Sequence, residues 1–135
     1  MPVDLEIVSP ERLLLSRPVD MVVVPGTEGD IGVLPGHTPM IVMLRGGAIS
    51  LYEGDRVSEQ LFVLGGFCEI TPERCTVLAE EVMPLAEVSR AVAEQRIAEA
   101  EAQSARVDTN DIVAVEAAQE ALLSARAMLD AAQSA

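Results

Sequence analysis

The chain contains no lysine and no tryptophan, and its 135 residues include only one histidine, two cysteines and three aromatic side chains. Nine arginines stand against 22 acidic residues, which gives a formal net charge of −13. Such acidity repels nucleic-acid backbones and anionic lipid surfaces, so macromolecular partners should be neutral or basic. The need for solubility alone also explains much of this acidity. With so few aromatics, a core has to be built from valine, leucine, isoleucine and methionine.

Long apolar runs and targeting signals are also missing. No stretch approaches the roughly 20 apolar residues of a membrane span, so no direct lipid insertion is expected. The N-terminus lacks the basic and apolar regions of a signal peptide, and Asp4, Glu6 and Glu11 stand where a mitochondrial transit peptide would be rich in arginine. We therefore expect a cytosolic bacterial protein. Cys68 and Cys75 have neither CxxC spacing nor a nearby histidine, which favours small buried hydrophobes over a disulfide or a metal site.

Glycine and proline are absent from the last 51 residues, whereas all nine glycines and all eight prolines lie at or before Pro84. Alanine dominates after that point. This change of composition predicts a boundary between a β-rich domain, residues 1–84, and an α-helical domain, residues 85–135.

The first part shows short apolar runs separated by Gly and Pro turn signals, the spacing expected of a sandwich. The overall prediction is a two-part α+β fold, with an N-terminal antiparallel β-sandwich of about nine or ten short strands followed by a C-terminal antiparallel two-helix hairpin. The strands are expected at about Val3–Ser9, Leu13–Ser16, Val19–Val24, Gly29–Leu34, Thr38–Leu44, Ala48–Tyr52, Gln60–Leu64, Phe67–Thr71 and Cys75–Ala79.

The composition of residues 85–135 predicts two helices, separated by a break near residues 107–110. The first should run from about Glu87 to Arg106, and the second should begin near Asp108 or Thr109 as N-cap, with Asp111 in its first turn. Positions three or four apart define an inner face on each helix. These faces are Val88, Ala91, Gln95, Ala98, Ala102 and Ala105, and then Ile112, Val115, Ala118, Leu122, Ala125 and Leu129. Alanine buries little area, so the hairpin should be held weakly and be able to detach.

The residue pattern indicates no catalytic or metal centre. His37 has neither a nucleophile in a motif context nor a second histidine beside it, and no Lys-Ser or Lys-Thr follows the glycine-rich segments. Glu28 and Asp30 are close enough in sequence to form a carboxylate pair, although acidic residues in such loops are usually solvated turn formers. We expect no cofactor and no enzyme acting alone.

The segment from Val22 to Met40, VVVPGTEGDIGVLPGHTPM, is the most specific feature of the chain. Its core, PGTEGDIGVLPGH, together with a β-domain followed by two helices, resembles the epsilon subunit of the bacterial F-type ATP synthase, the equivalent of the mitochondrial delta subunit. The resemblance implies a non-catalytic rotor subunit of the central stalk. Such a subunit couples proton flow through the membrane ring to ATP synthesis, and it is a peripheral protein on the cytoplasmic side of the bacterial inner membrane.

The resemblance also implies partner surfaces. Glu28, Asp30 and His37 would lie in loops that face the ring of c-subunits, where acidic groups would complement basic ones. Ser9, His37 and Val42 would lie on or near the surface that faces the gamma subunit. For Ser9, a turn before Pro10 explains the residue equally well, and for Val42 so does a place in the core of a strand.

Some members of that family bind ATP on the hairpin. Here Glu87 and Arg90 would be the remnant of the motif, with Glu in place of Asp, and the second helix carries only Arg126 as a basic residue. A surface pair between Glu87 and Arg90 explains them more simply, so ATP binding is doubtful. The same shortage of basic residues weakens the expected transient contact of the hairpin with the catalytic alpha and beta subunits, which inhibits ATP hydrolysis. The alternatives are a stand-alone ligand-binding module, with the hairpin as nucleotide sensor, and an adaptor that dimerises through its helices.

Overall fold

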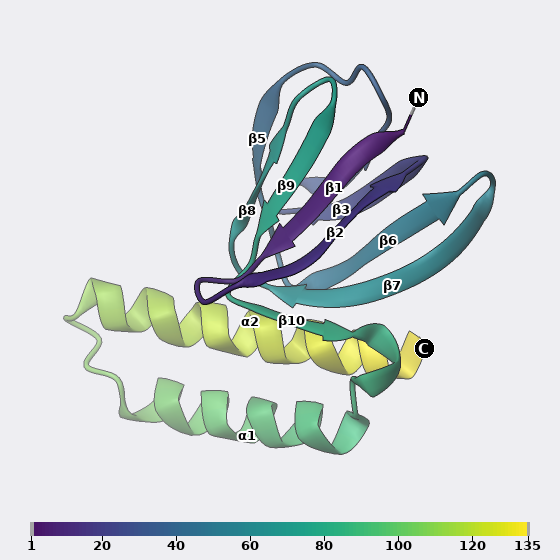
Figure 1. Cartoon of the computed structure of the whole chain (residues 1–135). Coiled ribbons are helices and arrows are strands. Elements are labelled where there is room, and N and C mark those ends of the chain that lie inside the picture. The colour runs from purple at the N-terminus through teal and green to yellow at the C-terminus, as the bar shows by residue number, and fades with distance from the viewer. Residues whose placement is uncertain (1, 135) are drawn as a thin grey trace.

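Two β-sheets face one another and a helical hairpin lies across one end of them in the computed structural model, which describes residues 2–134 (Figure 1). The strands are β1 (Val3–Val8), β2 (Leu13–Val19), β3 (Met21–Gly26), β4 (Gly29–Val33), β5 (Met40–Met43), β6 (Gly47–Glu53), β7 (Arg56–Leu64), β8 (Phe67–Ile70), β9 (Arg74–Leu78) and β10 (Glu81–Pro84). The predicted sandwich of nine or ten short strands is confirmed.

One sheet has the order β2-β1-β9-β8-β5 and the other has the order β10-β7-β6-β3-β4. Every neighbouring pair is antiparallel except β1 and β9, which run parallel. That pairing joins residues about seventy positions apart, for example Leu5 with Cys75, so no local signal predicted it. It leaves β2 and β5 as the edges of the first sheet.

The core follows from the alternation of side chains across each strand. In β1, Val3, Leu5 and Ile7 are fully buried while Asp4 points outward. Cys68 and Cys75 are also fully buried in the cluster between the sheets, as expected of small hydrophobes. The cluster contains aliphatic residues, alanine and cysteine but no aromatic ring.

Three strands are longer than predicted and one was missed. β6 gains one residue at each end, Gly47 and Glu53. β2 continues through Pro18, which is tolerated because β2 is an edge strand. β7 begins at Arg56 instead of Gln60, since it pairs along the whole length of β6. β10 was not predicted, because its four residues, EVMP, show no alternation, and it is defined by its pairing with β7.

The helical part begins with a single 3₁₀ turn, Leu85–Glu87, followed by α1 (Arg90–Arg106) and α2 (Ile112–Ser134). Both predicted helix starts were too early. Ser89 caps α1, since its side chain accepts a hydrogen bond from the Val92 amide at 3.4 Å. Asp111 caps α2 by accepting one from the Ala114 amide at 3.1 Å, while Asp108 bonds the Asn110 amide in the connecting turn.

The predicted inner face of α1 was mostly wrong. Of its members only Val88, just before the helix, is buried, while Ala91, Gln95, Ala98, Ala102 and Ala105 are exposed. The buried residues of α1 are Ala93 and Ala100. Alanines occur on several faces of this helix, so periodicity could not choose among them. The face of α2 was largely right, with Ala118 and Ala125 buried, although Ile112 is 69% exposed.

A small apolar cluster joins the hairpin to the sandwich. Phe62 and Leu64 of β7 pack with Val88, Ala93 and Met128, and half-buried residues surround them. Phe62 and Met128 are fully buried. This cluster is separate from the core between the sheets, so the hairpin covers a face that the sandwich does not need for its own interior.

Candidate interaction surfaces

Glu28 lies in the tight turn between β3 and β4, and Asp30 lies just after that turn. Asp30 belongs to β4, and its Oδ1 accepts a 2.5 Å hydrogen bond from the guanidinium of Arg45 in the loop before β6. No arginine is near Asp30 in sequence, and the fold supplies one from 15 positions away. Both side chains of the pair are about half exposed. Sequence reasoning missed Arg45 because its contact with Asp30 forms only when β5 brings the following loop beside β4.

His37 is at the other end of the sandwich from Glu28. β4 runs between them, and the loop after β4 is tied to the β8–β9 turn by a hydrogen bond from the Gly36 amide to the Pro72 carbonyl. Figure 1 shows the β4–β5 loop at the end of the sandwich farthest from the helices. The ring of His37 contacts the Thr38 carbonyl through Nδ1 at 2.7 Å. The three residues predicted to face one ring therefore do not form one surface.

Ser9 and Val42 also differ from one another. Ser9 lies in the β1–β2 turn, at the end of the sandwich that carries the hairpin (Figure 1), and its hydroxyl exchanges hydrogen bonds with Arg12 across that turn. Val42 is buried with 7% exposure in the core between the sheets, which is the place in the core of a strand that the sequence left open for it.

The neighbours of Val42 on the edge strand β5 form the exposed apolar feature of this region. Met40, Ile41 and Met43 are 40%, 66% and 59% exposed, and we refer to them as the β5 patch. β5 pairs with β8 in its sheet, and on its other side only its last residue is bonded, where the Met43 carbonyl accepts a hydrogen bond from the Thr27 amide at 2.9 Å, among the hydrogen bonds of the described residues. An apolar sheet edge that is largely unpaired is a surface on which another chain can dock.

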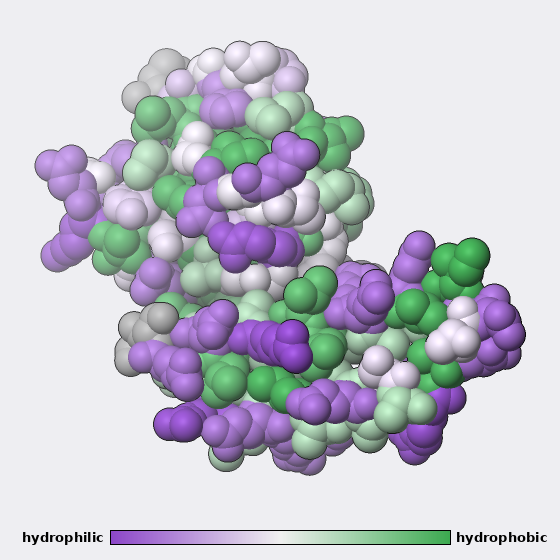
Figure 2. Space-filling view, turned by 180° about the vertical axis from the view of Figure 1, so that it is seen from behind, coloured by the Kyte–Doolittle hydropathy of each residue, from purple (hydrophilic) through white to green (hydrophobic). Residues whose placement is uncertain are grey.

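Hydrophobic side chains are also exposed elsewhere. Figure 2 shows the back of the molecule, with hydrophobic residues at the end of the hairpin that carries the α1–α2 turn. Ile112 and Val113, at the start of α2, are 69% and 78% exposed.

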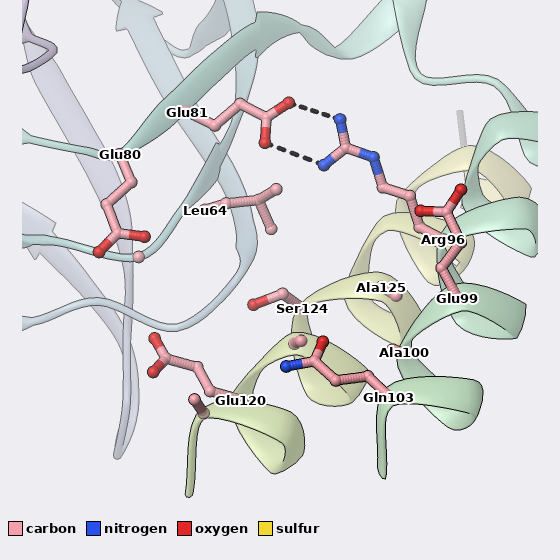
Figure 3. Close-up of a pocket in the computed structure, with 13 residues that line it drawn as sticks. Leu64, Glu80, Glu81, Arg96, Glu99, Ala100, Gln103, Glu120, Ser124 and Ala125 are labelled. Carbon is pink, nitrogen blue, oxygen red and sulfur yellow. Dashed lines mark hydrogen bonds and ion pairs between the residues drawn. The ribbon is translucent and has the colours of Figure 1, made fainter. Parts of the chain in front are cut away.

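A cavity of about 480 Å³ lies between β10, α1 and α2 (Figure 3). Its polar lining is mostly acidic, with Glu80, Glu81, Glu99 and Glu120 against the single cation Arg96 among the described residues. Arg96 donates two hydrogen bonds to Glu81, Nη1 to Oε2 at 2.9 Å and Nη2 to Oε1 at 2.6 Å. The pKa of Glu81 is lowered chiefly by these hydrogen bonds, and they raise the pKa of Arg96.

Glu87 and Arg90 do not line this cavity and do not pair with each other. Glu87 is in the 3₁₀ turn, whereas the Arg90 guanidinium contacts Glu94 at 3.0 Å within α1. The expected surface pair is therefore replaced by an i,i+4 pair, which the helix start at Arg90 makes possible.

Among residues 2–134, no group of three or more His, Cys, Asp or Glu side chains is arranged to hold a metal ion. In the same range, no helix has the length and apolar composition needed to cross a bilayer. The candidate functional features are therefore surfaces: the β5 patch, the charged turn at Glu28 and the cavity between β10 and the hairpin.

The sandwich and its appended hairpin define a class of protein. Residues 2–85 match the family model described as the ATP synthase delta/epsilon chain, beta-sandwich domain. Solved structures with this fold include two chains of ATP synthase complexes. They are a chain of the Euglena gracilis mitochondrial ATP synthase (TM-score 0.76, 22% identity, 96% of this chain and 81% of that one) and a chain of the Tetrahymena thermophila central stalk and c-ring (TM-score 0.66, 12% identity, 98% and 97%).

Sequence relatives extend the match over the helices. The ATP synthase epsilon chain of Granulibacter bethesdensis is 60% identical over 129 residues, covering 96% of each chain. That of Rhodospirillum rubrum is 48% identical over 128 residues, covering 91% of this chain and 95% of the relative. That of Gluconacetobacter diazotrophicus is 42% identical over 132 residues, covering 98% and 94%. The chain belongs to the ATP synthase epsilon chain family.

Proposed function

We propose that this chain is a non-catalytic subunit of the central stalk of a bacterial F-type ATP synthase, where it links the gamma subunit to the c-ring and transmits rotation between them. The epsilon-chain relatives, which match over nearly the whole chain, carry the proposal. The chain would work at the cytoplasmic side of the inner membrane as a peripheral protein. The relevant properties are a rigid sandwich and exposed docking surfaces, so its own side chains would make and break no bonds.

We assign the β5 patch to the gamma subunit. Ile41 is a large apolar residue that is 66% exposed, and it lies on a sheet edge that can accept a partner. His37 and Ser9 stay as additional expected contacts at the two ends of the sandwich. Val42 supports this surface only from inside, by anchoring β5 to the core.

Assembly with gamma tests the assignment. Ile41→Ser should reduce co-purification of the chain with co-expressed gamma, because it removes apolar area from the centre of the patch. Leu13→Ser is the matched control, since Leu13 is 56% exposed on β2, the opposite edge strand of the same sheet. Equal co-purification of both variants with gamma would rule out the β5 patch.

We assign Glu28 to the c-ring. Asp30 is neutralised by Arg45, whereas Glu28 is an exposed carboxylate at the tip of the turn. Glu28→Lys should weaken ATP-driven proton pumping in reconstituted membranes by reversing the charge at that contact. Asp55→Lys is the control, because Asp55 is in the β6–β7 turn at the other end of the same sheet. Equal pumping by the two variants would contradict the assignment.

A nucleotide-sensing role is the weaker alternative. The cavity under the hairpin is lined by four glutamates, and its one arginine is already paired with Glu81. Three phosphates need several free cationic donors. We therefore propose that the chain does not bind ATP at millimolar concentration and contacts the catalytic alpha and beta subunits at most transiently. Titration calorimetry that gave a micromolar Kd would reverse this conclusion.

A further inference from the structure

The backbone of β5 directs its hydrogen-bonding groups to two opposite sides. On the side of β8, the amide of Leu44, just after the strand, donates to the Gly66 carbonyl at 3.1 Å. On the other side, the Met43 carbonyl accepts the hydrogen bond from Thr27. Backbone groups in an antiparallel ladder alternate between the two sides from one residue to the next. The amide and the carbonyl of Ile41 therefore face the same side as those of Met43, away from β8.

That side of Ile41 is open. Among residues 2–134, no hydrogen bond to its outward amide or carbonyl is formed. The neighbouring segment, residues 25–27, covers only the end of β5 and then turns away into β4. Beside the uncovered part lies a groove of about 370 Å³, which is lined by residues 26–31 and 40–43. Figure 1 shows β5 as the outermost strand of its sheet, so the groove runs along a free sheet edge.

The chemistry of this edge favours one kind of occupant. An outward amide and carbonyl beside a 66% exposed apolar side chain suit an added strand, which gains affinity from main-chain hydrogen bonds and specificity from alternate side chains. A helix cannot supply these bonds, because its own backbone groups are bonded internally. The groove therefore fits an extended segment.

The position of the groove indicates where that segment comes from. All three residues of the β5 patch, Met40, Ile41 and Met43, are also part of the groove lining. A partner that covers the patch must therefore also occupy the groove, and the two form one continuous surface.

We propose that an extended segment of the gamma subunit adds to the free edge of β5 as a further strand, bonded through the amide and the carbonyl of Ile41. This inference rests on the function proposed above and specifies how the β5 patch binds. The five-stranded sheet of this chain continues into its partner, and the main chain of β5 contributes to affinity together with its side chains.

Two substitutions at Ile41 separate the main chain from the side chain. Ile41→Pro removes the outward amide but keeps an apolar side chain, and an edge strand tolerates proline where the amide faces away from the sheet. Ile41→Ala is the matched control, because it removes more apolar area and keeps the amide. Displacement of the labelled unmodified chain from purified gamma should show that Ile41→Pro binds at least about tenfold more weakly than Ile41→Ala, because an acceptor of gamma is left buried and unpaired.

Hydrogen exchange of the unmodified full-length chain is an independent measurement, and it decides the matter if circular dichroism shows that Ile41→Pro is unfolded. Followed by NMR, the Ile41 amide should exchange on the order of tenfold or more slowly in the complex with gamma than in the free chain. Protection that instead rises with the concentration of the free chain would mean that a second copy takes the edge, which would overturn the proposal.

The remaining outcomes separate this inference from the function on which it rests. If gamma binds but the two variants have equal affinity, or if gamma leaves the exchange rate of the Ile41 amide unchanged, strand addition is wrong and the assignment of the β5 patch to gamma stands. If the unmodified chain does not bind gamma at all, the proposed function fails and strand addition fails with it.

Discussion

At the scale of single residues, the turn after β7 shows how closely the backbone packs. Gly65 and Gly66 both have positive φ, 68° and 93°, and they reverse the chain between β7 and β8. A Cβ on Gly66 would lie 1.8 Å from the carbonyl oxygen of Leu78, a backbone atom that cannot rotate away. Glycine is required there for two reasons, the backbone conformation and the space.

Gly66→Ala should therefore destabilise the sandwich by more than backbone strain alone, which is about 1–2 kcal/mol. Gly36→Ala is the control, because Gly36 also has positive φ, 82°, and nothing lies within 4 Å of its added Cβ. Urea unfolding should show a clearly larger loss for Gly66→Ala, roughly 3 kcal/mol or more. A loss equal to that of Gly36→Ala would mean that β9 yields to the new methyl group.

The two cysteines give a second prediction at this scale. Their sulfur atoms are 3.1 Å apart and both residues are fully buried. The pKa of Cys75 is raised, first by the hydrogen bond with Cys68 and then by burial. The native protein should show no thiol reactive toward Ellman's reagent at neutral pH and two after denaturation.

The raised pKa of Cys75 also sets a pH dependence. A group that titrates higher in the folded state contributes its full stability below the unfolded pKa, about 8.5 for a thiol, and this contribution declines as the pH rises above that value. The free energy of unfolding of the native chain should fall between pH 8 and pH 10 more than that of Cys75→Ala. Parallel curves for the two proteins would show that the thiol does not titrate on unfolding.

At the scale of elements, sequence patterns succeeded where neighbours are local. Alternation in β1 and the turn signals around Gly26 and Gly54 located strands, since both depend on a few adjacent residues. They failed for β10 and for the inner face of α1. β10 is defined by its partner β7, and the face of α1 by Phe62 and Met128, both of which are distant in sequence.

The attachment of α1 to β10 should weaken in acid. The pKa of Glu81 is lowered by Arg96, so its contribution to stability is present above the ordinary glutamate pKa, about 4.3, and is lost as the pH falls through the lower folded value. Carboxyl NMR should place the Glu81 pKa below that ordinary value in the native chain. In Arg96→Gln it should return upward. A value that does not change on substitution would remove Arg96 as the cause.

At the scale of the whole molecule, composition predicted the order of the β-sandwich and the hairpin, but it did not predict which residues share a surface. The loss of Gly and Pro after Pro84 coincides with the end of β10 and the start of the helices. Partner-facing residues could not be grouped from sequence, because β4 separates Glu28 from His37 and the fold pairs Asp30 with Arg45. The β5 patch was also missed, since a run such as MIVM does not reveal which side faces water.

The division of the molecule predicts the result of removing the hairpin. The core between the sheets consists only of residues before Pro84, so residues 1–84 should fold and melt cooperatively on their own. Removing the hairpin also uncovers Phe62 and Leu64 of β7, which pack against it in the full chain. The truncated chain should therefore self-associate, and Phe62→Thr should keep it monomeric while preserving a residue suited to a strand. Sedimentation velocity and thermal melts of the two truncated proteins decide the matter. If both are unfolded, the hairpin is part of the folding core; if both are monomeric, Phe62 is not the side chain that the hairpin protects.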